Sequence, residues 1–336
     1  MLAVLTIATL ALGAASAAFV VLLVWRRTAL AGQERGRSAT EHRLRPFALA
    51  LAAGDDDVAF PVLDRSEQAI LAEALARVSR QVTGEARTRI ADYFECSAAL
   101  ASELGALRTR RGWRRASAAF RLGDMGCAVA IPALLVALHD RDREVRSSAA
   151  RSLGRLGADD AAVPLVESLV GATIARPIAF RALLDIGAAA LPGLRQMARD
   201  ADPDIRSTAI ELLGWLGGAF DAALLVGALT DSSAEVRARA ASALGRLAAA
   251  DGAEALAGAL DDRIYFVRLQ AARALGQVGE VTAVPALLRQ AREDRFEAAR
   301  AAAAAVAMID PDALLVAANE PGAGPHIHEA ADLLCI

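Results

Sequence analysis

The feature that most constrains the fold is a repeated pattern, seen in full at residues 140–157 (DRDREVRSSAARSLGRLG). Aligned on Val145, its reference position recurs in steps of 30 or 31 residues and gives seven copies, at Arg114, Val145, Ala175, Ile205, Val236, Val267 and Ala298. A fixed period of this length is typical of stacked structural units that bury their apolar faces against one another. The sequence therefore predicts an array of such units.

Each copy contains an apolar stripe with helical spacing. Alanine stands four residues after every reference position, and larger aliphatic residues stand eight and eleven after it. These spacings predict one face of a helix. A first set of glycines predicts close approach of a neighbouring helix: Gly123, Gly154, Gly214, Gly245 and Gly276. A second set is placed to end the helix: Gly126, Gly157, Gly187, Gly217 and Gly279.

Two polar columns accompany the apolar stripe. Acids stand five residues before the reference position, at Asp140, Asp200, Asp231, Asp262 and Glu293. Arginines stand one residue after it, at Arg115, Arg146, Arg176, Arg206, Arg237 and Arg268. The acid can accept hydrogen bonds from free amides at a helix start, and the arginine can bridge to an acid of its own or the adjacent unit. We therefore expect a ladder of ion pairs along the array.

Shorter apolar stretches between the copies, such as 128–138 and 222–229, predict a first helix paired with each longer second helix. Pro132, Asp140, Val145 and Arg146 match in order a HEAT repeat of the short bacterial kind also seen in phycobilisome lyase proteins. The resemblance covers residues 99–318 and implies an all-α solenoid of stacked antiparallel helix pairs. It implies a binding surface and says little about catalytic chemistry.

The third copy departs from the pattern. Val170 and Ala175 stand where an acid and a larger aliphatic residue are expected, and Pro177 follows Arg176. Because proline suits the first turn of a helix, this second helix is expected to start late. We predict a local change in the array at this copy.

The N-terminus carries an uncharged apolar run, Leu2 to Trp25. As a helix its 24 residues would extend about 36 Å, which is enough to cross a hydrocarbon core of about 30 Å. A cleaved signal peptide is the alternative, with Ala15-Ser16-Ala17 as the cleavage site, although the run continues well beyond it. Arginines follow the run and none precedes it, so the positive-inside rule places the remainder in the cytoplasm, as a single-pass protein of the inner membrane.

The expected domain order follows from these features. Residues 2–25 form a transmembrane signal anchor, and residues 26–62 a juxtamembrane tether with one short helix near Phe47 to Ala53. Residues 63–98 form an N-terminal helical cap, since a stacked array leaves its first apolar face bare. Residues 99–318 form the solenoid of about seven units, and residues 319–336 a solvated C-terminal tail.

Composition argues against catalysis and nucleic-acid binding. The net charge is −3, whereas nucleic-acid binders are usually basic, and the chain has four histidines. Cys96, Cys127 and Cys335 are far apart, as expected of unreactive free thiols. No nucleotide-binding, metalloprotease or nucleophile motif occurs in a suitable context. We predict no enzyme activity, catalytic residue, cofactor or metal.

Two groups of residues are candidates for binding. In HEAT arrays the second helices line the concave face. The resemblance therefore implies that the residues three, six and ten positions after each reference position are exposed. The partner-binding candidates there are Arg151, Arg155, Arg181, Glu211, Trp215, Arg239, Arg246 and Arg273. A basic patch is predicted from Arg108, Arg110, Arg111, Trp113, Arg114 and Arg115, for anionic lipid or nucleic acid. The alternatives are a solvated helix face with Trp215 partly packed, and a turn of solvated arginines with Trp113 packed on the cap.

The sequence therefore predicts a membrane-anchored adaptor whose solenoid binds a protein partner at the cytoplasmic face. Proteins of this layout resemble bacterial accessory factors, and the client class considered is a membrane glycosyltransferase or another envelope enzyme. A HEAT-repeat enzyme related to chromophore lyases and a nucleic-acid-binding HEAT protein are the competing hypotheses.

Overall fold

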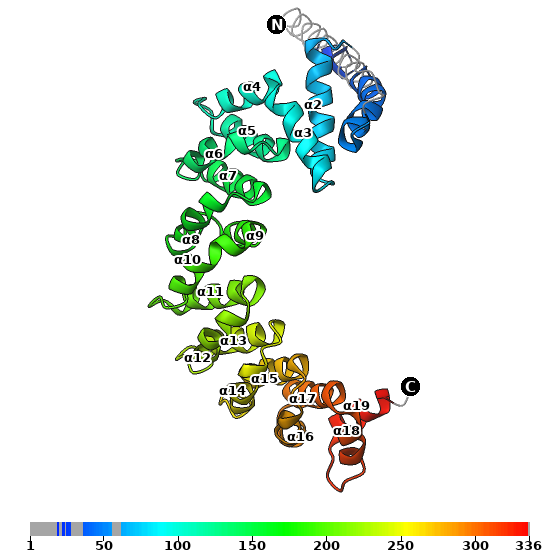
Figure 1. Cartoon of the computed structure of the whole chain (residues 1–336), viewed down its shortest axis with the longest axis vertical. Helices are drawn as coiled ribbons and strands as arrows, with labels where there is room; N and C mark the ends of the chain where they lie inside the picture. The colour runs from blue at the N-terminus through cyan, green and yellow to red at the C-terminus, as the bar shows by residue number, and fades with distance from the viewer. Residues whose placement is uncertain (1–18, 20–21, 24, 28–35, 56–61, 335–336) are drawn as a thin grey trace, which may run out of the picture. The chain divides into compact units, whose positions relative to one another are not determined.

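The computed structural model describes residues 19, 22–23, 25–27, 36–55 and 62–334. Every regular element within these residues is helical, which confirms the predicted all-α class. The chain divides into two compact units, Met1–Ala130 and Ile131–Ile336, which are described separately below (Figure 1).

The predicted transmembrane span, Leu2–Trp25, lies for the most part outside the described residues. Phe19, Leu22, Leu23 and Trp25 are described, and their side chains are exposed. Among the described residues, one helical run, 176–197, has the length and apolar composition needed to cross a membrane. That run lies within the repeats and consists of two α-helices separated at Gly187, whose φ of +82° ends the first of them.

The first unit is a bundle of short helices. They are a helix over residues 36–53, α2 (Arg65–Ser79), α3 (Glu85–Glu95), α4 (Ala98–Ala106) and α5 (Gly112–Met125), followed by the 3-10 turn η1 (Ala128–Ala130). Asp64 begins α2 by accepting hydrogen bonds from the amides of Ser66 and Glu67. Leu75, Phe94 and Leu122 are fully buried between these helices.

The helix over residues 36–53 is longer than the segment Phe47–Ala53 expected from the sequence. Its Leu44 and Ala48 are fully buried, and Arg89 of α3 donates to the carbonyl of Ala52 at 3.1 Å. Three ion pairs also join this helix to α2: Arg37 with Glu73, Glu41 with Arg77, and Arg43 with Glu67. This part of the expected tether therefore packs as a helix of the first unit.

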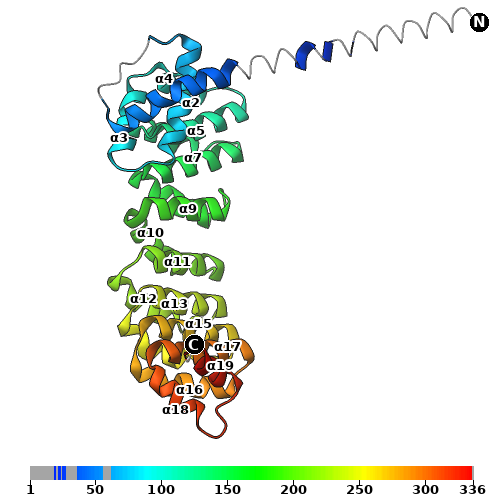
Figure 2. The same ribbon diagram turned by 90° about the vertical axis from the view of Figure 1, so that its right-hand side faces the viewer.

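The second unit is a row of helix pairs (Figure 2). The first helices are α6 (Ile131–Ala137), α8 (Ala162–Val170), α10 (Leu191–Met197), α12 (Ala222–Ala228), α14 (Ala253–Ala259), α16 (Val284–Glu293) and α18 (Pro311–Ala318). The second helices are α7 (Arg143–Leu156), α9 (Arg176–Ile186), α11 (Pro203–Leu216), α13 (Ala234–Arg246), α15 (Tyr265–Val278), α17 (Phe296–Ile309) and α19 (Pro325–Leu334). Five 3-10 turns lead into first helices: η2 (Asp159–Ala161), η3 (Gly187–Ala190), η4 (Ala219–Asp221), η5 (Ala250–Gly252) and η6 (Val281–Ala283).

Helix α18 lies within the expected solenoid, whereas α19 lies in residues 319–336, where a solvated tail is expected. Helix α19 packs on α17 as each second helix packs on its predecessor, and Ile327 is fully buried. The ring of His326 contacts the ring of Phe296 edge to face, with 4.7 Å between the centroids.

Small residues set the spacing of the second helices, as the first set of glycines predicted. A Cβ atom added to Gly214 would lie 2.6 Å from the Cβ atom of Ala243, and the same clash arises at Gly154 against Ala182 and Gly245 against Ala274. Each glycine stands nine residues after its reference position, and each alanine seven residues after the next. Because neither residue extends beyond Cβ, the backbones of adjacent second helices can come into contact.

The predicted ion-pair ladder is present from α11 to α17. Arg206 pairs with Asp231, Arg237 with Asp262 and Arg268 with Asp294, each through Nε and Nη2 at 2.5–3.0 Å. Each arginine also donates through Nη1 to a backbone carbonyl in the turn before its own helix. The last acid is Asp294 and not Glu293, because the shorter turn between α16 and α17 moves the carboxylate by one residue.

The close crossings are interrupted between α9 and α11, and the acid–arginine ladder is absent from α7 to α11, where Arg146 donates to the carbonyl of Thr173. Pro177 delays the start of α9, which begins at Arg176, one residue after its reference position, whereas α11 begins two residues before its own. Arg176 is exposed and has no side-chain partner in the described part of the chain. Leu184 and Leu212 replace the glycine and the alanine of the other crossings. Accordingly, α9 and α11 pack less closely than any other successive second helices of this unit.

Candidate partner-binding surface

The second helices of the second unit share one exposed surface, which we call the second-helix wall. It is formed by Arg239 and by residues six and ten positions after each reference position: Arg151, Arg155, Arg181, Asp185, Glu211, Trp215, Ser242, Arg246, Arg273, Gln277, Ala304 and Met308. The exposure expected at position three is wrong for Ser148 and Thr208, which are buried. Thr208 instead donates to the carbonyl of Asp204 within its own helix.

Trp215 is held in place by Arg246 of the neighbouring helix. The guanidinium carbon of Arg246 lies 4.6 Å from the centre of the indole ring, within the range of a cation–π contact. Arg246 Nη1 donates to Ser242 Oγ at 3.0 Å, and burial lowers the pKa of Arg246. The side chain of Trp215 is nevertheless 57% exposed. One part of the indole is therefore packed and the rest is exposed, and the role of Trp215 as a partner anchor stays a prediction.

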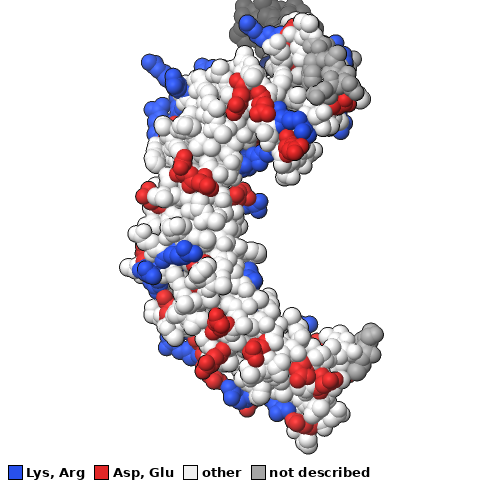
Figure 3. Space-filling view, in the orientation of Figure 1, with Lys and Arg blue, Asp and Glu red and all other residues white. Residues whose placement is uncertain are grey.

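Several arginines of the wall are already paired with acids. Arg239 bridges Glu211 of α11 and Glu235 of its own helix at 2.9 and 2.8 Å, and Arg181 pairs with Asp185 at 2.9 Å. Figure 3 shows arginines and acids interspersed on one face of this unit, without a large area of one sign. Arg151 and Arg273, by contrast, form no ion pair with any described residue. These two arginines are the members of the wall best placed to receive an anionic group.

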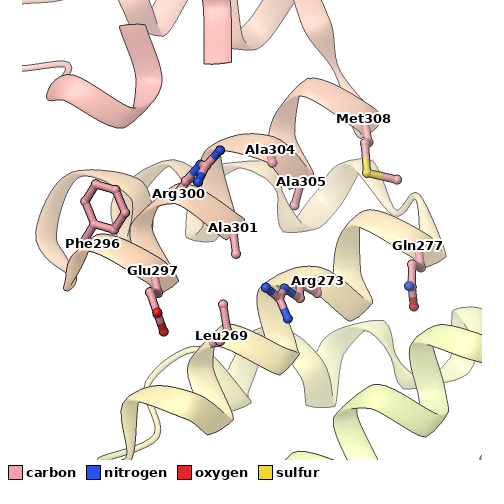
Figure 4. Close-up of a pocket in the computed structure, with 10 residues that line it drawn as sticks. All are labelled: Leu269, Arg273, Gln277, Phe296, Glu297, Arg300, Ala301, Ala304, Ala305 and Met308. Atoms are coloured by element: carbon pink, nitrogen blue, oxygen red, sulfur yellow. The ribbon is translucent and has the colours of Figure 1, made fainter. Parts of the chain in front are cut away.

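A groove opens in the wall between α15 and α17. Its volume is about 700 Å³, and it is lined by Leu269, Arg273, Gln277, Phe296, Glu297, Arg300, Ala301, Ala304, Ala305 and Met308. Figure 4 shows Phe296 at one end, Met308 and Gln277 at the other, Arg273 on α15, and the guanidinium group of Arg300 on the side of α17 away from α15. Phe296 and Met308 are 63% and 67% exposed. The groove therefore offers an apolar surface bordered by two cations.

Of the residues lining this groove, sequence analysis named Arg273 as a candidate. Ala301, Ala304 and Met308 stand three, six and ten residues after Ala298, the same register that selected the other candidates. Extending that register to the seventh copy would have found them. Phe296 stands two residues before the reference position, as the exposed Tyr265 stands before Val267, and this register was not used to select candidates.

The predicted basic patch lies in the first unit, at the turn between α4 and α5. Arg108, Arg110, Arg111 and Arg114 are exposed, and Trp113 is 65% exposed, so it is not packed on the cap. The prediction that Arg115 belongs to this patch is wrong, because Arg115 is buried and donates through Nη1 to the carbonyls of Thr109 and Arg110. Arg115 thus braces the turn, as the ladder arginines do in the second unit.

Few of the described side chains are suited to binding a metal ion or to reacting as a thiol. Within the described ranges, no three His, Cys, Asp or Glu side chains lie close enough together to hold a metal ion. Cys127 is buried, and its pKa is raised to about 12 by burial and by the nearby Glu95 and Asp92. Cys96 is exposed, and Cys335 lies outside the described residues.

Comparisons with known proteins agree with this architecture. The family of HEAT repeats matches residues 104–183 and 222–307. No curated protein matches the chain.

The fold resembles several solved structures. Human deoxyhypusine hydroxylase in complex with glycerol is 22% identical, covering 82% of this chain and 98% of its own, with a TM-score of 0.33. The complex of CpcE and CpcF of phycocyanin lyase from Nostoc sp. PCC7120 is also 22% identical, covering 75% and 96%, with a TM-score of 0.31. Importin beta is 14% identical, covering 83% of this chain and 46% of its own, with a TM-score of 0.47. At these identities the likeness concerns the fold alone.

Proposed function

We propose that the protein, whose residues 104–183 and 222–307 match the family of HEAT repeats, is a membrane-anchored adaptor whose second-helix wall binds a protein partner. The single observation that carries the proposal is the groove between α15 and α17, where Phe296 and Met308 remain exposed beside two arginines. Exposed apolar side chains next to arginine are frequent anchors of protein interfaces. The role is binding and not catalysis.

The chemistry of the wall defines the segment that it binds. Arg273 forms no ion pair within the described ranges, and Arg300 contacts Glu329 at 3.7 Å. A partner that places an apolar side chain between Phe296 and Met308 would bring a neighbouring carboxylate to these guanidinium groups. Trp215, pinned by Arg246, supplies a second apolar contact farther along the wall. We therefore propose an extended, acidic segment with at least one large apolar side chain.

The proposed place of action is the cytoplasmic face of the inner membrane. Leu2–Trp25 is uncharged and long enough to span the bilayer once, and Arg26 and Arg27 follow it immediately. A client in the same membrane, such as a glycosyltransferase or another envelope enzyme, would present a cytoplasmic segment to the wall. Protease added to spheroplasts should leave the repeats intact, and their digestion from outside would contradict this orientation.

Site-specific photo-crosslinking in cells tests the binding surface. A photoreactive residue at Ala304, inside the groove, should capture a defined partner, whereas one at Val136, exposed on the first helix α6, should not. Met308→Ala together with Trp215→Ala should reduce that capture by about tenfold or more, since interface anchors each contribute about 2 kcal/mol. Phe220→Ala removes an exposed aromatic side chain from η4 and serves as the matched control. Equal capture from Ala304 and Val136 would refute the proposal.

A further inference from the structure

The turn between α8 and α9 contains no acid, and neither does the turn between α4 and α5, which thus differs in charge from five turns of the following repeats. In those turns the acid is Asp140, Asp200, Asp231, Asp262 or Asp294, and each accepts a hydrogen bond from a backbone amide one or two residues later. Thr109 takes this place here, and its hydroxyl donates to the carbonyl of Ala106 at 2.9 Å. The buried Arg115 completes the turn by binding two of its carbonyls. The turn is therefore ordered without any acidic side chain.

The side chains that this turn presents are cationic and aromatic. Arg108, Arg110, Arg111 and Arg114 are exposed, and the guanidinium carbon of Arg114 lies 5.3 Å from the centre of the Trp113 ring. Arg108, Arg111 and Arg114 form no ion pair with an acidic side chain anywhere in the described ranges. A group of basic side chains projects from this end of the first unit in Figure 3. We call Arg108, Arg110, Arg111, Trp113 and Arg114 the Trp113 patch.

We propose that the Trp113 patch binds the phosphate-bearing headgroups of an anionic membrane, as a second contact besides the N-terminal span. Guanidinium groups pair strongly with phosphate oxygens, and four clustered arginines suffice to attract a cytoplasmic leaflet. The indole of tryptophan is favoured at the level of the headgroups, where one part of the ring is apolar and the other is wet. An exposed tryptophan inside a basic cluster has both properties that such an interface requires.

The surroundings favour lipid over nucleic acid as the source of the phosphates. The patch occupies one turn and the start of one helix, whereas nucleic-acid binders usually present a basic stripe that follows a helix or a whole face. The inference rests on the proposed anchor, which keeps the first unit close to a bilayer. Bound in this way, the patch would restrict how the first unit is oriented on the membrane surface.

Fluorescence of the full-length protein in lipid nanodiscs tests the inference. Trp25→Phe with Trp215→Phe leaves Trp113 as the single tryptophan, and brominated lipids quench an indole that reaches the headgroup region. We expect Trp113 to be quenched at least twofold more in discs containing anionic phosphatidylglycerol than in neutral phosphatidylcholine discs. Arg108→Glu with Arg111→Glu should reduce quenching to the neutral level, while Arg263→Glu, an exposed turn arginine of the second unit, should leave it unchanged.

The readouts separate failure of the patch from failure of the anchor. Incorporation of the protein into neutral discs depends on the N-terminal span alone. Quenching of Trp113 in anionic discs depends on the patch, and it is measurable even when the protein binds only at the disc surface. Quenching that is equal in neutral and anionic discs, or that survives both charge reversals, would overturn the proposal. Loss of quenching on addition of an oligonucleotide at low concentration would also overturn it, in favour of nucleic acid. Circular dichroism confirms that each variant remains folded.

Discussion

Arg237 binds Asp262 of the next repeat through two hydrogen bonds, of 2.6 and 3.0 Å, while its Nη1 donates to the carbonyl of Asp231 at 2.8 Å. Arg237 itself is buried. One side chain thus fixes both its own turn and the following turn, and the same geometry is repeated at Arg206 and Arg268.

Removing one carboxylate from this ladder should be costly. We expect Asp262→Asn to lower the free energy of unfolding by about 2 kcal/mol, because it leaves a buried guanidinium without its counter-ion. The neighbouring Asp261 pairs with Arg289 at the surface, so Asp261→Asn should cost less than about 1 kcal/mol. Urea unfolding followed by circular dichroism compares the two variants. Equal losses would show that the ladder adds no more than a surface ion pair.

The ladder should also make stability depend on pH. The Arg268 guanidinium holds the pKa of Asp294 below its ordinary value, so this carboxyl binds a proton less readily in the folded chain than in the unfolded chain. Its contribution is complete above the unfolded pKa of about 4 and is lost as the pH falls through the folded pKa. The stability difference between the native chain and Asp294→Asn should therefore be largest near pH 7 and shrink toward pH 3. A difference that stays constant over this range would contradict the assignment.

The glycines at the helix crossings should not tolerate alanine. In Gly214→Ala the new methyl group would lie 2.6 Å from Ala243 Cβ and 2.8 Å from its Cα, so α11 and α13 must move apart. We expect destabilisation of about 1–3 kcal/mol, despite the better helix propensity of alanine. Gly227 in α12 has open space around it, and Gly227→Ala should stabilise the chain by about 0.5–1 kcal/mol. Thermal unfolding of both variants measures the contrast.

The loose step between α9 and α11 should be the first part of the second unit to open. Leu184 and Leu212 hold the two backbones apart there, and Arg176 contributes no ion pair. We expect the amides of α9 to exchange with deuterium about tenfold faster than those of α13 and α15, which have a close neighbour on each side. Hydrogen exchange with mass spectrometry gives this comparison. Uniform protection along the second helices would show that the loose step does not weaken the array.

The two described cysteines should differ in reactivity. Burial and the nearby acids raise the pKa of Cys127 to about 12, so its thiolate is scarce at neutral pH, whereas Cys96 is exposed. Maleimide should modify Cys96 in the native chain and Cys127 only after unfolding. Peptide mapping by mass spectrometry assigns each site. Rapid modification of Cys127 would show that the first unit opens readily.

The periodic features were predictable because each depends on a residue at a fixed place in every unit. The spacing of Ala149, Leu153 and Leu156 indicated the buried stripe, and Pro177 correctly predicted the late start of α9. The acid and arginine columns indicated the ladder, although spacing alone could not show that Arg206 reaches forward to Asp231 while also binding its own turn.

Features that depend on non-repeating contacts were harder to predict. The helix over residues 36–53 gains its stability from α2 and α3, and its local sequence suggested a shorter element. The position of Arg115 in a basic run suggested exposure, whereas its repeat register had already assigned it to the turn. The groove required Phe296, which lies outside the register used to select candidates. In each case tertiary packing outweighed the local pattern.

The forward-reaching arginine also bears on how the chain can lengthen. The units of α13 and α15 each offer a carboxylate to the unit before and a guanidinium to the unit after, so a duplicate of either unit would find matching partners on both sides. A tandem copy of residues 234–264 should therefore be accommodated without an unpaired charge, and each such copy would extend the binding surface by one helix. The unit containing α9 lacks this complementarity, so a duplicate of that unit would not form these ion pairs with its neighbours.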